Sequence, residues 1–290
     1  MKKFLNFLIN TVIFLLILAG SLLVGWHFTQ EDIMLYLSQV EVNPEEFEMN
    51  LIETAETAEF DWDVVEDLDW QGLLPYINYE ASPIGELIVP SVEMRLPILQ
   101  GTSNANVSLG AATMLPDLVM GQGNFSLASH WHPNPRITFG SLDQIEYGDL
   151  IILRDANYLY IYETIVQNKI IEPYRWDITE EAPGEVWVTL MTCTPGGARR
   201  VMARGEFIAQ ISFTDLEAAE AALAELEGLE TGIVTEIIKV LEDTRIPFPI
   251  AHVTLTIGGS IVVAAFVVWI ANRGSKSKGD EGSKVIKNEL

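Results

Sequence analysis

Two long apolar runs lie near the ends of the chain and predict membrane-spanning helices. Residues 4–26 contain no charged side chain and follow Lys2 and Lys3. Residues 248–271 likewise contain no Asp, Glu, Lys or Arg, and a basic tail follows them. A helix of about 20 apolar residues crosses the hydrocarbon core of a bilayer. We therefore predict an N-terminal transmembrane anchor over residues 1–26 and a C-terminal transmembrane helix over residues 248–271.

Each run has an alternative interpretation. Ala19, Gly20 and Ser21 would suit the cleavage site of a signal peptide, although the run over residues 4–26 exceeds the roughly 7–15 apolar residues of a usual signal. The second run would otherwise be a buried core helix, although such helices rarely stay uncharged over a comparable length. The pattern favours two membrane spans.

Charge is distributed unevenly along the chain and orients the predicted spans. Residues 30–250 hold 10 basic and 38 acidic residues, whereas the two tails have a net positive charge. Positively charged flanks stay on the cytoplasmic side of a membrane. We therefore expect a multi-pass protein of the cell membrane, with both termini in the cytoplasm and the middle of the chain outside it.

Between the two apolar runs, the pattern of apolar positions changes twice. Residues 27–83 are acidic and have helical spacing that is interrupted at Pro44, followed by a stretch of acidic and aromatic residues. Residues 84–213 consist of short apolar segments separated by Gly, Pro, Asn and Asp, which is typical of strands and turns. Residues 214–247 return to an acidic helical pattern, and residues 272–290 form the basic cytoplasmic tail.

The strand-like region predicts an all-β domain. About eight short strands with frequent turns, within roughly 130 residues, are typical of a barrel or a sandwich. The clearest segments cover residues 85–90, 95–101, 124–130, 148–155, 157–170, 185–193 and 200–213. Their pattern alone leaves the choice between barrel and sandwich open.

The overall composition excludes several classes of protein. The formal net charge is −24, from 17 Lys and Arg against 41 Asp and Glu. A general nucleic-acid binder needs a basic face that replaces phosphate counterions, so nucleic acid is excluded as a partner. An apolar content of 49% excludes a disordered chain. The single cysteine excludes a disulfide within the chain and a zinc site built from cysteines.

Cys193 is the first candidate for chemistry because it ends a strand-like run and precedes a polar turn. Nucleophiles often lie at such strand ends, although unpaired cysteines are also commonly buried spectators. A thiol nucleophile needs a proton-transfer partner. His130 and His132 follow a predicted strand and are the two histidines away from the predicted spans. Two histidines alone do not define a metal site.

Three arginines follow the cysteine closely in a region with few basic residues. They are Arg199, Arg200 and Arg204. Arginine is always charged and presents its donors in a fixed fork, which suits it to hold a developing oxyanion. The alternative is that each arginine only neutralises nearby acidic residues.

The run Thr189-Leu-Met-Thr-Cys193 with a downstream arginine resembles the TLxTC…R signature of sortases, the cysteine transpeptidases of the Gram-positive cell surface. The resemblance covers residues 84–213, in order and at compatible spacing. It implies a closed eight-stranded β-barrel with flanking helices, in addition to the two transmembrane helices. Further segments that are similar to the family are residues 88–90, 96–101, 113–117, 120–130 and 142–149.

The resemblance implies a role for particular side chains. His130 matches the catalytic histidine of the family, Cys193 the nucleophile and Arg200 the catalytic arginine. The chain departs from the usual pattern through the extra His132 and through Arg199, which adjoins the expected arginine in a short loop. The substrate-binding residues that the resemblance implies are Ala128, Leu190 and Thr192.

The subclass signals are mixed. The barrel motifs look like class A sortases, which anchor proteins to the cell wall, whereas two spans and a long N-terminal segment look like class C, which polymerises pilins. Class C enzymes often carry a lid with an Asp-Pro-aromatic motif, which this chain lacks. Asp61-Trp62 and Asp69-Trp70 are the candidates for such a lid, since each offers an acid and an indole, but a plain acidic surface loop is the favoured interpretation.

The resemblance also implies the reaction. A sortase cleaves an LPxTG-like sorting motif between Thr and Gly through a thioacyl-enzyme and transfers the product to an amine, from a pilin lysine or a peptidoglycan precursor. The expected partners are surface proteins or pilins that carry the motif, together with the membrane. No cofactor is implied, and no motif in the chain specifies a metal site, calcium included. The alternatives are a membrane-tethered β-barrel that only binds its partners and a cysteine hydrolase.

Overall fold

The computed structural model describes residues 2–38, 40–60, 68 and 70–212. The chain divides into two compact units, and the boundary near the N-terminus falls between Ile33 and Met34. The predicted helix over residues 214–247, the second predicted span over 248–271 and the tail over 272–290 lie outside the described residues.

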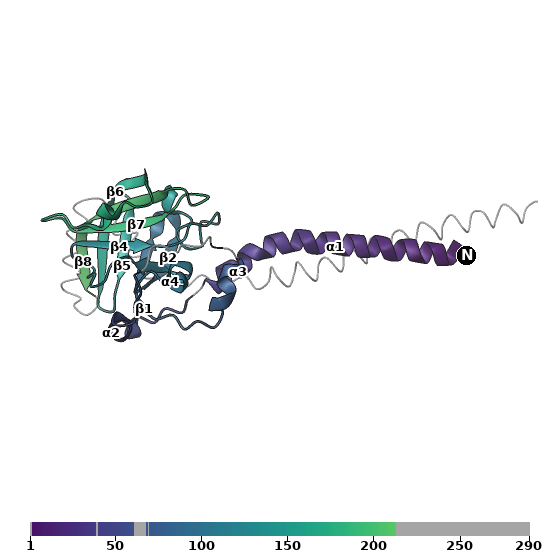
Figure 1. Cartoon of the computed structure of the whole chain (residues 1–290), viewed down its shortest axis with the longest axis horizontal. Coiled ribbons are helices and arrows are strands. Elements are labelled where there is room, and N and C mark those ends of the chain that lie inside the picture. The colour runs from purple at the N-terminus through teal and green to yellow at the C-terminus, as the bar shows by residue number, and fades with distance from the viewer. Residues whose placement is uncertain (1, 39, 61–67, 69, 213–290) are drawn as a thin grey trace, which may run out of the picture. The chain divides into compact units, whose positions relative to one another are not determined.

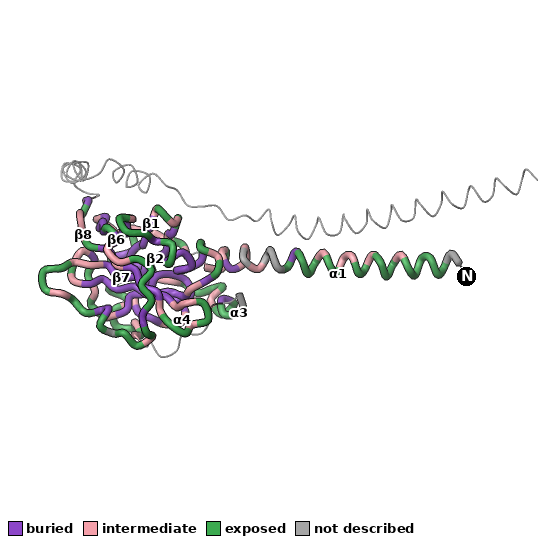
Figure 2. Tube along the Cα trace, turned by 90° about the horizontal axis from the view of Figure 1, so that it is seen from above, coloured by how far each residue is buried: buried purple, intermediate pink, exposed green. Residues whose placement is uncertain are grey.

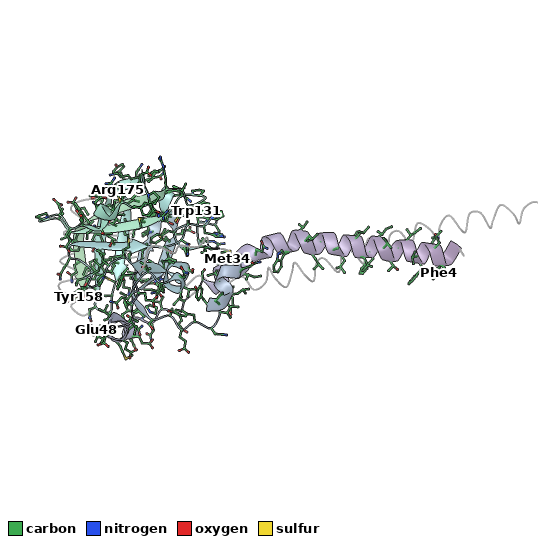
Figure 3. All side chains as sticks on the ribbon, in the orientation of Figure 1. Phe4, Met34, Glu48, Trp131, Tyr158 and Arg175 are labelled. Atoms are coloured by element: carbon green, nitrogen blue, oxygen red, sulfur yellow. The ribbon has the colours of Figure 1, made fainter. Side chains whose placement is uncertain are left out.

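A single long helix, α1 (Lys2–Leu37), contains the first apolar run (Figure 1). Within the described part of the chain, its stretch Phe4–Trp26 is the one helix that is long and apolar enough to cross a membrane, and no residue in its most apolar part is buried. Figure 2 colours most residues of this helix as exposed or intermediate, and Figure 3 shows the side chains from Phe4 onwards. The prediction of an apolar helix at residues 4–26 is confirmed.

Eight strands form a closed barrel in the order β1-β2-β3-β4-β7-β8-β6-β5 (Figure 1). The pairs β2–β3 and β4–β7 are parallel, and the other neighbours are antiparallel. This closure decides between the barrel and the sandwich that the strand pattern had left open. The strands are β1 (Pro83–Val89), β2 (Met94–Leu99), β3 (Ala111–Thr113), β4 (Asn124–Ala128), β5 (Leu150–Arg154), β6 (Tyr158–Ile171), β7 (Trp187–Cys193) and β8 (Arg200–Ser212).

The barrel interior is filled by large apolar side chains that alternate along the strands with outward-facing residues. Successive side chains of a strand point to opposite faces, so each strand contributes every second residue to the interior. Figure 2 shows the buried residues concentrated inside the barrel. The largest fully buried members of this core include Tyr162, Phe125, Phe139, Leu87, Ile98 and Leu127.

Two short elements between β2 and β4 have no counterpart among the strands expected from the sequence. Helix α4 (Asn104–Leu109) begins at Ser103, whose hydroxyl accepts a hydrogen bond from the backbone amide of Asn106. Strand β3 follows at once and has only three residues. Such a short strand shows no period-two pattern, so its place comes from pairing with β2 and β4.

The described part of the acidic N-terminal segment contains short helices joined by irregular stretches, and part of it packs on the barrel. The 3-10 helix η1 (Pro44–Glu46) begins at the predicted break and leads into α2 (Phe47–Ala55). Asn50 Nδ2 donates to the carbonyl of Pro83 in β1 over 2.8 Å. Glu48, labelled in Figure 3, accepts a hydrogen bond from Asn157 beside β6. These bonds make α2 part of the barrel domain.

A second contact of this segment lies beneath the loop that follows β4. Helix α3 (Trp70–Leu73) and η2 (Leu74–Tyr76) bring Leu73 into a buried cluster with Leu99, Leu109 and Ile137. Leu73 is fully buried. The remaining 3-10 helices are η3 (Pro90–Val92), η4 (Leu142–Gln144) and η5 (Trp176–Thr179).

We predict that Gly101→Ala destabilises the protein more than Gly184→Ala. Both glycines have a positive φ, 86° and 85°, so an alanine at either costs about 1–2 kcal/mol. A Cβ at Gly101 would also lie 2.6 Å from the carbonyl of Glu59, which accepts a hydrogen bond from Thr102, whereas Gly184 has open space. Equal losses in urea unfolding of the two variants would contradict the close packing of this segment on the barrel.

Candidate active site

Three strand ends come together at one end of the barrel. Strand β7 lies between β4, to which it is parallel, and β8, to which it is antiparallel. Ala128 at the end of β4 pairs with Met191, and Cys193 at the end of β7 pairs with Arg200 at the start of β8. The candidate nucleophile and the candidate catalytic arginine are therefore direct cross-strand neighbours, although seven positions separate them in the chain.

Side-chain alternation divides β7 into two faces. Val188 and Leu190 belong to the core inside the barrel. The intervening Thr189, Met191 and Cys193 therefore lie on the outer face. The expected substrate-binding Leu190 is thus fully buried, on the opposite face of the strand from Cys193.

The outer face next to Cys193 has an apolar floor. Met191 and Met202 are paired across β7 and β8, one step of the same face from Cys193 and Arg200. They share a buried cluster with Ala128 from β4. Ala128 is therefore the expected substrate-binding residue that lies on the same sheet face as the thiol. The floor is completed by Met114, Ile171 and Ile178.

The backbone that carries His130 is fixed on both sides. The His130 amide donates to the carbonyl of Val107 in α4, and its own carbonyl accepts from the Phe139 amide and the Thr138 hydroxyl. One residue earlier, the carbonyl of Ser129 accepts a hydrogen bond from the Thr192 hydroxyl over 2.8 Å. This last bond links the residue before His130 to the residue before Cys193. Thr192 is buried and performs this link between strands.

His132 is buried, as His130 is, and makes a local hydrogen bond. Its Nδ1 accepts a hydrogen bond from the Asn134 amide over 2.9 Å, and the side chain is buried. An imidazole that accepts at Nδ1 is neutral, with its proton on Nε2. His132 therefore stabilises the turn that follows it.

The two adjacent arginines make different contacts. Arg199 is exposed and forms an ion pair with Glu172 at 3.4 Å. Arg200 is half-buried, and its Nη1 donates to the carbonyls of Gly197 and Arg199 in the turn between β7 and β8. A guanidinium carries five N–H donors, so these bonds leave the donors on Nε and Nη2 for a further partner.

Arg204 is a third arginine on the outer face, and burial lowers the pKa of its guanidinium. It pairs with Thr189 across β7 and β8, and its guanidinium lies 4.3 Å from the centre of the Trp187 ring. Arg204 belongs to the group of three arginines noted in the sequence. Its contacts with β7 and with the carbonyl of Ile178 in the η5 turn are not signalled by any local sequence pattern.

Most of the candidate lid residues lie outside the part of the chain that the structure describes. Asp61, Trp62 and Asp69 lie outside the described residues, and Trp70 is described only as the first residue of α3. Over residues 2–38, 40–60, 68 and 70–212, no group of three or more His, Cys, Asp and Glu side chains could hold a metal ion. The described chemistry at this end of the barrel is that of a thiol, an imidazole and guanidinium groups.

Comparison with known proteins matches this arrangement to one family. The model of the Sortase domain matches residues 87–208. The chain is 30% identical over 225 residues to a protein named Sortase A from Listeria monocytogenes, covering 76% of this chain and 96% of that protein. The chain belongs to the sortase family. It is therefore a cysteine transpeptidase by family, as the resemblance of its motifs had implied.

Two further comparisons with sortases cover shorter stretches of the chain. Sortase A from Streptococcus agalactiae is 33% identical over 129 residues, which is 42% of this chain and 52% of that protein. The solved structure of the Listeria monocytogenes sortase A is 31% identical, with a TM-score of 0.43, and covers 48% of this chain and 96% of the solved chain.

We predict that His130→Ala lowers sortase activity by about 100-fold or more, which is the usual contribution of a positioned acid or base. His132→Ala is expected to keep most of the activity and to lower the melting temperature, since His132 supports a turn. Rates of transpeptidation and thermal unfolding of the two variants check this. An inactive His132→Ala beside an active His130→Ala would reverse the assignment.

Proposed function

We propose that this sortase cleaves an LPxTG-like sorting motif between Thr and Gly and transfers the acyl part to an amine. The observation that carries the proposal is the pairing of Cys193 with Arg200 on the outer barrel face, with His130 fixed at the end of the neighbouring strand. A nucleophile, an oxyanion donor and a proton donor are the groups that acyl transfer requires.

The proposed first step forms a thioacyl-enzyme. The Cys193 thiolate attacks the threonine carbonyl carbon, and the carbonyl oxygen becomes negative. The C–N bond to glycine then breaks, and protonated His130 gives its proton to the departing amine. In the second step an incoming amine attacks the thioester, His130 accepts a proton from it, and Cys193 leaves as a thiolate.

Arg200 is proposed to stabilise the oxyanion. The carbonyls of Gly197 and Arg199 hold its Nη1, which restricts the guanidinium before substrate arrives. Donors that are already oriented stabilise a transition state without the cost of reorganisation. Arg199 is not assigned this role, because its ion pair with Glu172 directs it to the exposed surface.

The active form requires a thiolate and an imidazolium together. With the ordinary pKa of about 8.5 for a thiol and about 6.5 for an imidazole, under ~1% of molecules would hold both at pH 7. With these values the reaction would proceed through this minor form of the enzyme.

We further propose that the protein is anchored in the cell membrane with its barrel outside the cytoplasm. The apolar helix Phe4–Trp26 and the basic residues before it support the first span. A second span at residues 248–271 and a cytoplasmic basic tail complete the topology. Membrane anchoring raises the effective concentration of membrane-bound substrates near the site.

The proposed substrates are surface proteins that carry the sorting motif, and the favoured acceptor is a peptidoglycan precursor. The match to almost the whole length of a protein named Sortase A supports this choice. Transfer to a pilin lysine is the second candidate, favoured by the second apolar run and the acidic N-terminal segment. In that case Asp61-Trp62 or Asp69-Trp70 would serve as the lid.

Of the proposed substrate-binding residues, Ala128 is assigned to direct contact with the peptide because it belongs to the floor beside Cys193. Leu190 and Thr192 are assigned indirect roles. Leu190 supports β7 from inside the barrel, and Thr192 ties β7 to the strand that leads to His130.

We predict that Cys193→Ala abolishes transpeptidation, because no other thiol exists in the chain. In the wild-type protein, a Leu-Pro-x-Thr-Gly peptide should leave an acyl adduct on Cys193 that mass spectrometry detects and that added amine removes. A protein that binds the peptide with no adduct would be a binding module. An adduct that water removes as fast as amine does would indicate a hydrolase.

We predict that Arg200→Lys lowers kcat by about 100-fold, which is the usual effect of losing an oriented oxyanion donor. A lysine keeps the charge and loses the fork. Arg199→Lys is the matched control, since the exposed ion pair with Glu172 contributes at most about 1 kcal/mol. Single-turnover acylation rates compare the two variants, and a larger loss in Arg199→Lys would reverse their roles.

A further inference from the structure

Three residues on the outer barrel face and one in the η5 turn form a closed ring of hydrogen bonds that the proposed chemistry does not use. Arg204 Nε donates to the Thr189 hydroxyl over 3.0 Å, and this hydroxyl donates to Asn124 Oδ1 over 2.7 Å. Asn124 Nδ2 donates to the carbonyl of Ile178 over 2.7 Å, and Arg204 Nη2 reaches the same carbonyl over 2.7 Å. The Asn124 amide also contacts the carbonyl of Glu180 at 3.1 Å.

The ring joins parts of the chain that are far apart in sequence. Asn124 begins β4, Thr189 lies in β7 and Arg204 lies in β8, whereas Ile178 lies in the η5 turn of the connection between β6 and β7. Asn124 and Thr189 are almost fully buried. Polar groups at such depth need partners, so the carbonyl of Ile178 is required to complete the ring.

The ring holds an apolar side chain next to the active site. The backbone of Ile178 accepts the two hydrogen bonds, while its side chain packs in the buried floor with Met191 and Met202. These two methionines are the pair next to Cys193 and Arg200 on the same face. The position of the η5 turn over the floor therefore depends on Arg204.

We propose that Arg204, Thr189 and Asn124 are positioning residues that keep the η5 turn closed over the apolar floor and so preorganise the peptide-binding face beside Cys193. The proposal rests on the proposed sortase reaction for its substrate. The Arg204 guanidinium bonds to the backbone carbonyl of Ile178 and not to its side chain. This hydrogen bond therefore does not depend on which apolar side chain stands at position 178.

The expected signature is a change in KM with little change in kcat. Arg204 is separated from the reacting atoms by the methionine pair, so its loss does not alter bond making. Where a protein must first adopt its binding-competent form, the apparent affinity falls in proportion to the fraction in that form. If the η5 turn is closed in about one tenth of variant molecules, KM for the peptide rises about tenfold.

The experiment compares Arg204→Lys with Arg175→Lys in the full-length protein in detergent micelles. Arg175, labelled in Figure 3, belongs to the same connection, but its guanidinium bonds only to the exposed Asp177 two residues away. Kinetics of thioacyl formation with a Leu-Pro-x-Thr-Gly peptide give KM and kcat. Hydrogen exchange at the amides of Ile178 and Glu180, which close the η5 turn, gives its opening.

Support for the proposal is a rise of about tenfold in KM for Arg204→Lys, with kcat within about twofold, faster exchange at Ile178 and Glu180, and no such change in Arg175→Lys. An unchanged KM, or a fall in kcat at constant KM, overturns it. A second pair of variants keeps the test valid if Arg204→Lys unfolds. Thr189→Val, which lacks the hydroxyl, should raise KM and speed exchange in the same way, whereas Thr189→Ser, which keeps it, should have the KM and the exchange rates of the wild type.

Different results would contradict the proposed sortase reaction and the positioning role of Arg204. A wild-type protein that forms no adduct on Cys193 with the peptide contradicts the proposed function. A wild-type protein that forms the adduct, together with an Arg204→Lys variant whose KM and exchange equal those of the wild type, contradicts only the positioning role.

Discussion

The site depends on the pairing of β7 with two neighbours of opposite direction. The parallel contact with β4 brings the residue after Ser129 next to the end of β7, and the antiparallel contact with β8 sets Arg200 opposite Cys193. A slip of one residue in either register would exchange the inner and outer faces of the strand. The apolar residues inside the barrel, such as Val188 and Leu190, resist that slip because their burial would be lost.

The outer face of the barrel beside the site buries polar side chains as well as apolar ones. Thr189 is fully buried on this face and is satisfied by Arg204 and Asn124. A buried polar group that loses its partner costs about 1–3 kcal/mol. Arg204 and Asn124, which satisfy Thr189, also donate to the carbonyl of Ile178 in the η5 turn. The residues that stabilise the buried Thr189 are therefore the ones proposed to preorganise the peptide-binding face.

The other support of the site comes from the N-terminal segment. Leu73 and Ile137 pack together in a buried cluster, and Ile137 lies in the loop that returns to the carbonyl of His130 through Phe139. The segment that follows α1 thus supports the loop that holds the backbone of His130. A chain shortened to the strands alone would lose this packing, which gives the acidic helical segment a physical role beyond spacing.

The apolar N-terminal helix, the strand-rich domain and the family are predictable from the sequence, because apolar runs, period-two segments and the run Thr189–Cys193 are local patterns. The sequence also identified Cys193, His130 and Arg200 as candidates. Three features follow from the folded structure instead: the barrel closes, Arg200 rather than Arg199 pairs with Cys193, and Leu190 lies inside the barrel. The same applies to the contacts of Arg204. Each of these depends on which strands become neighbours, and strand pairing joins residues whose separation in the chain leaves no periodic signal.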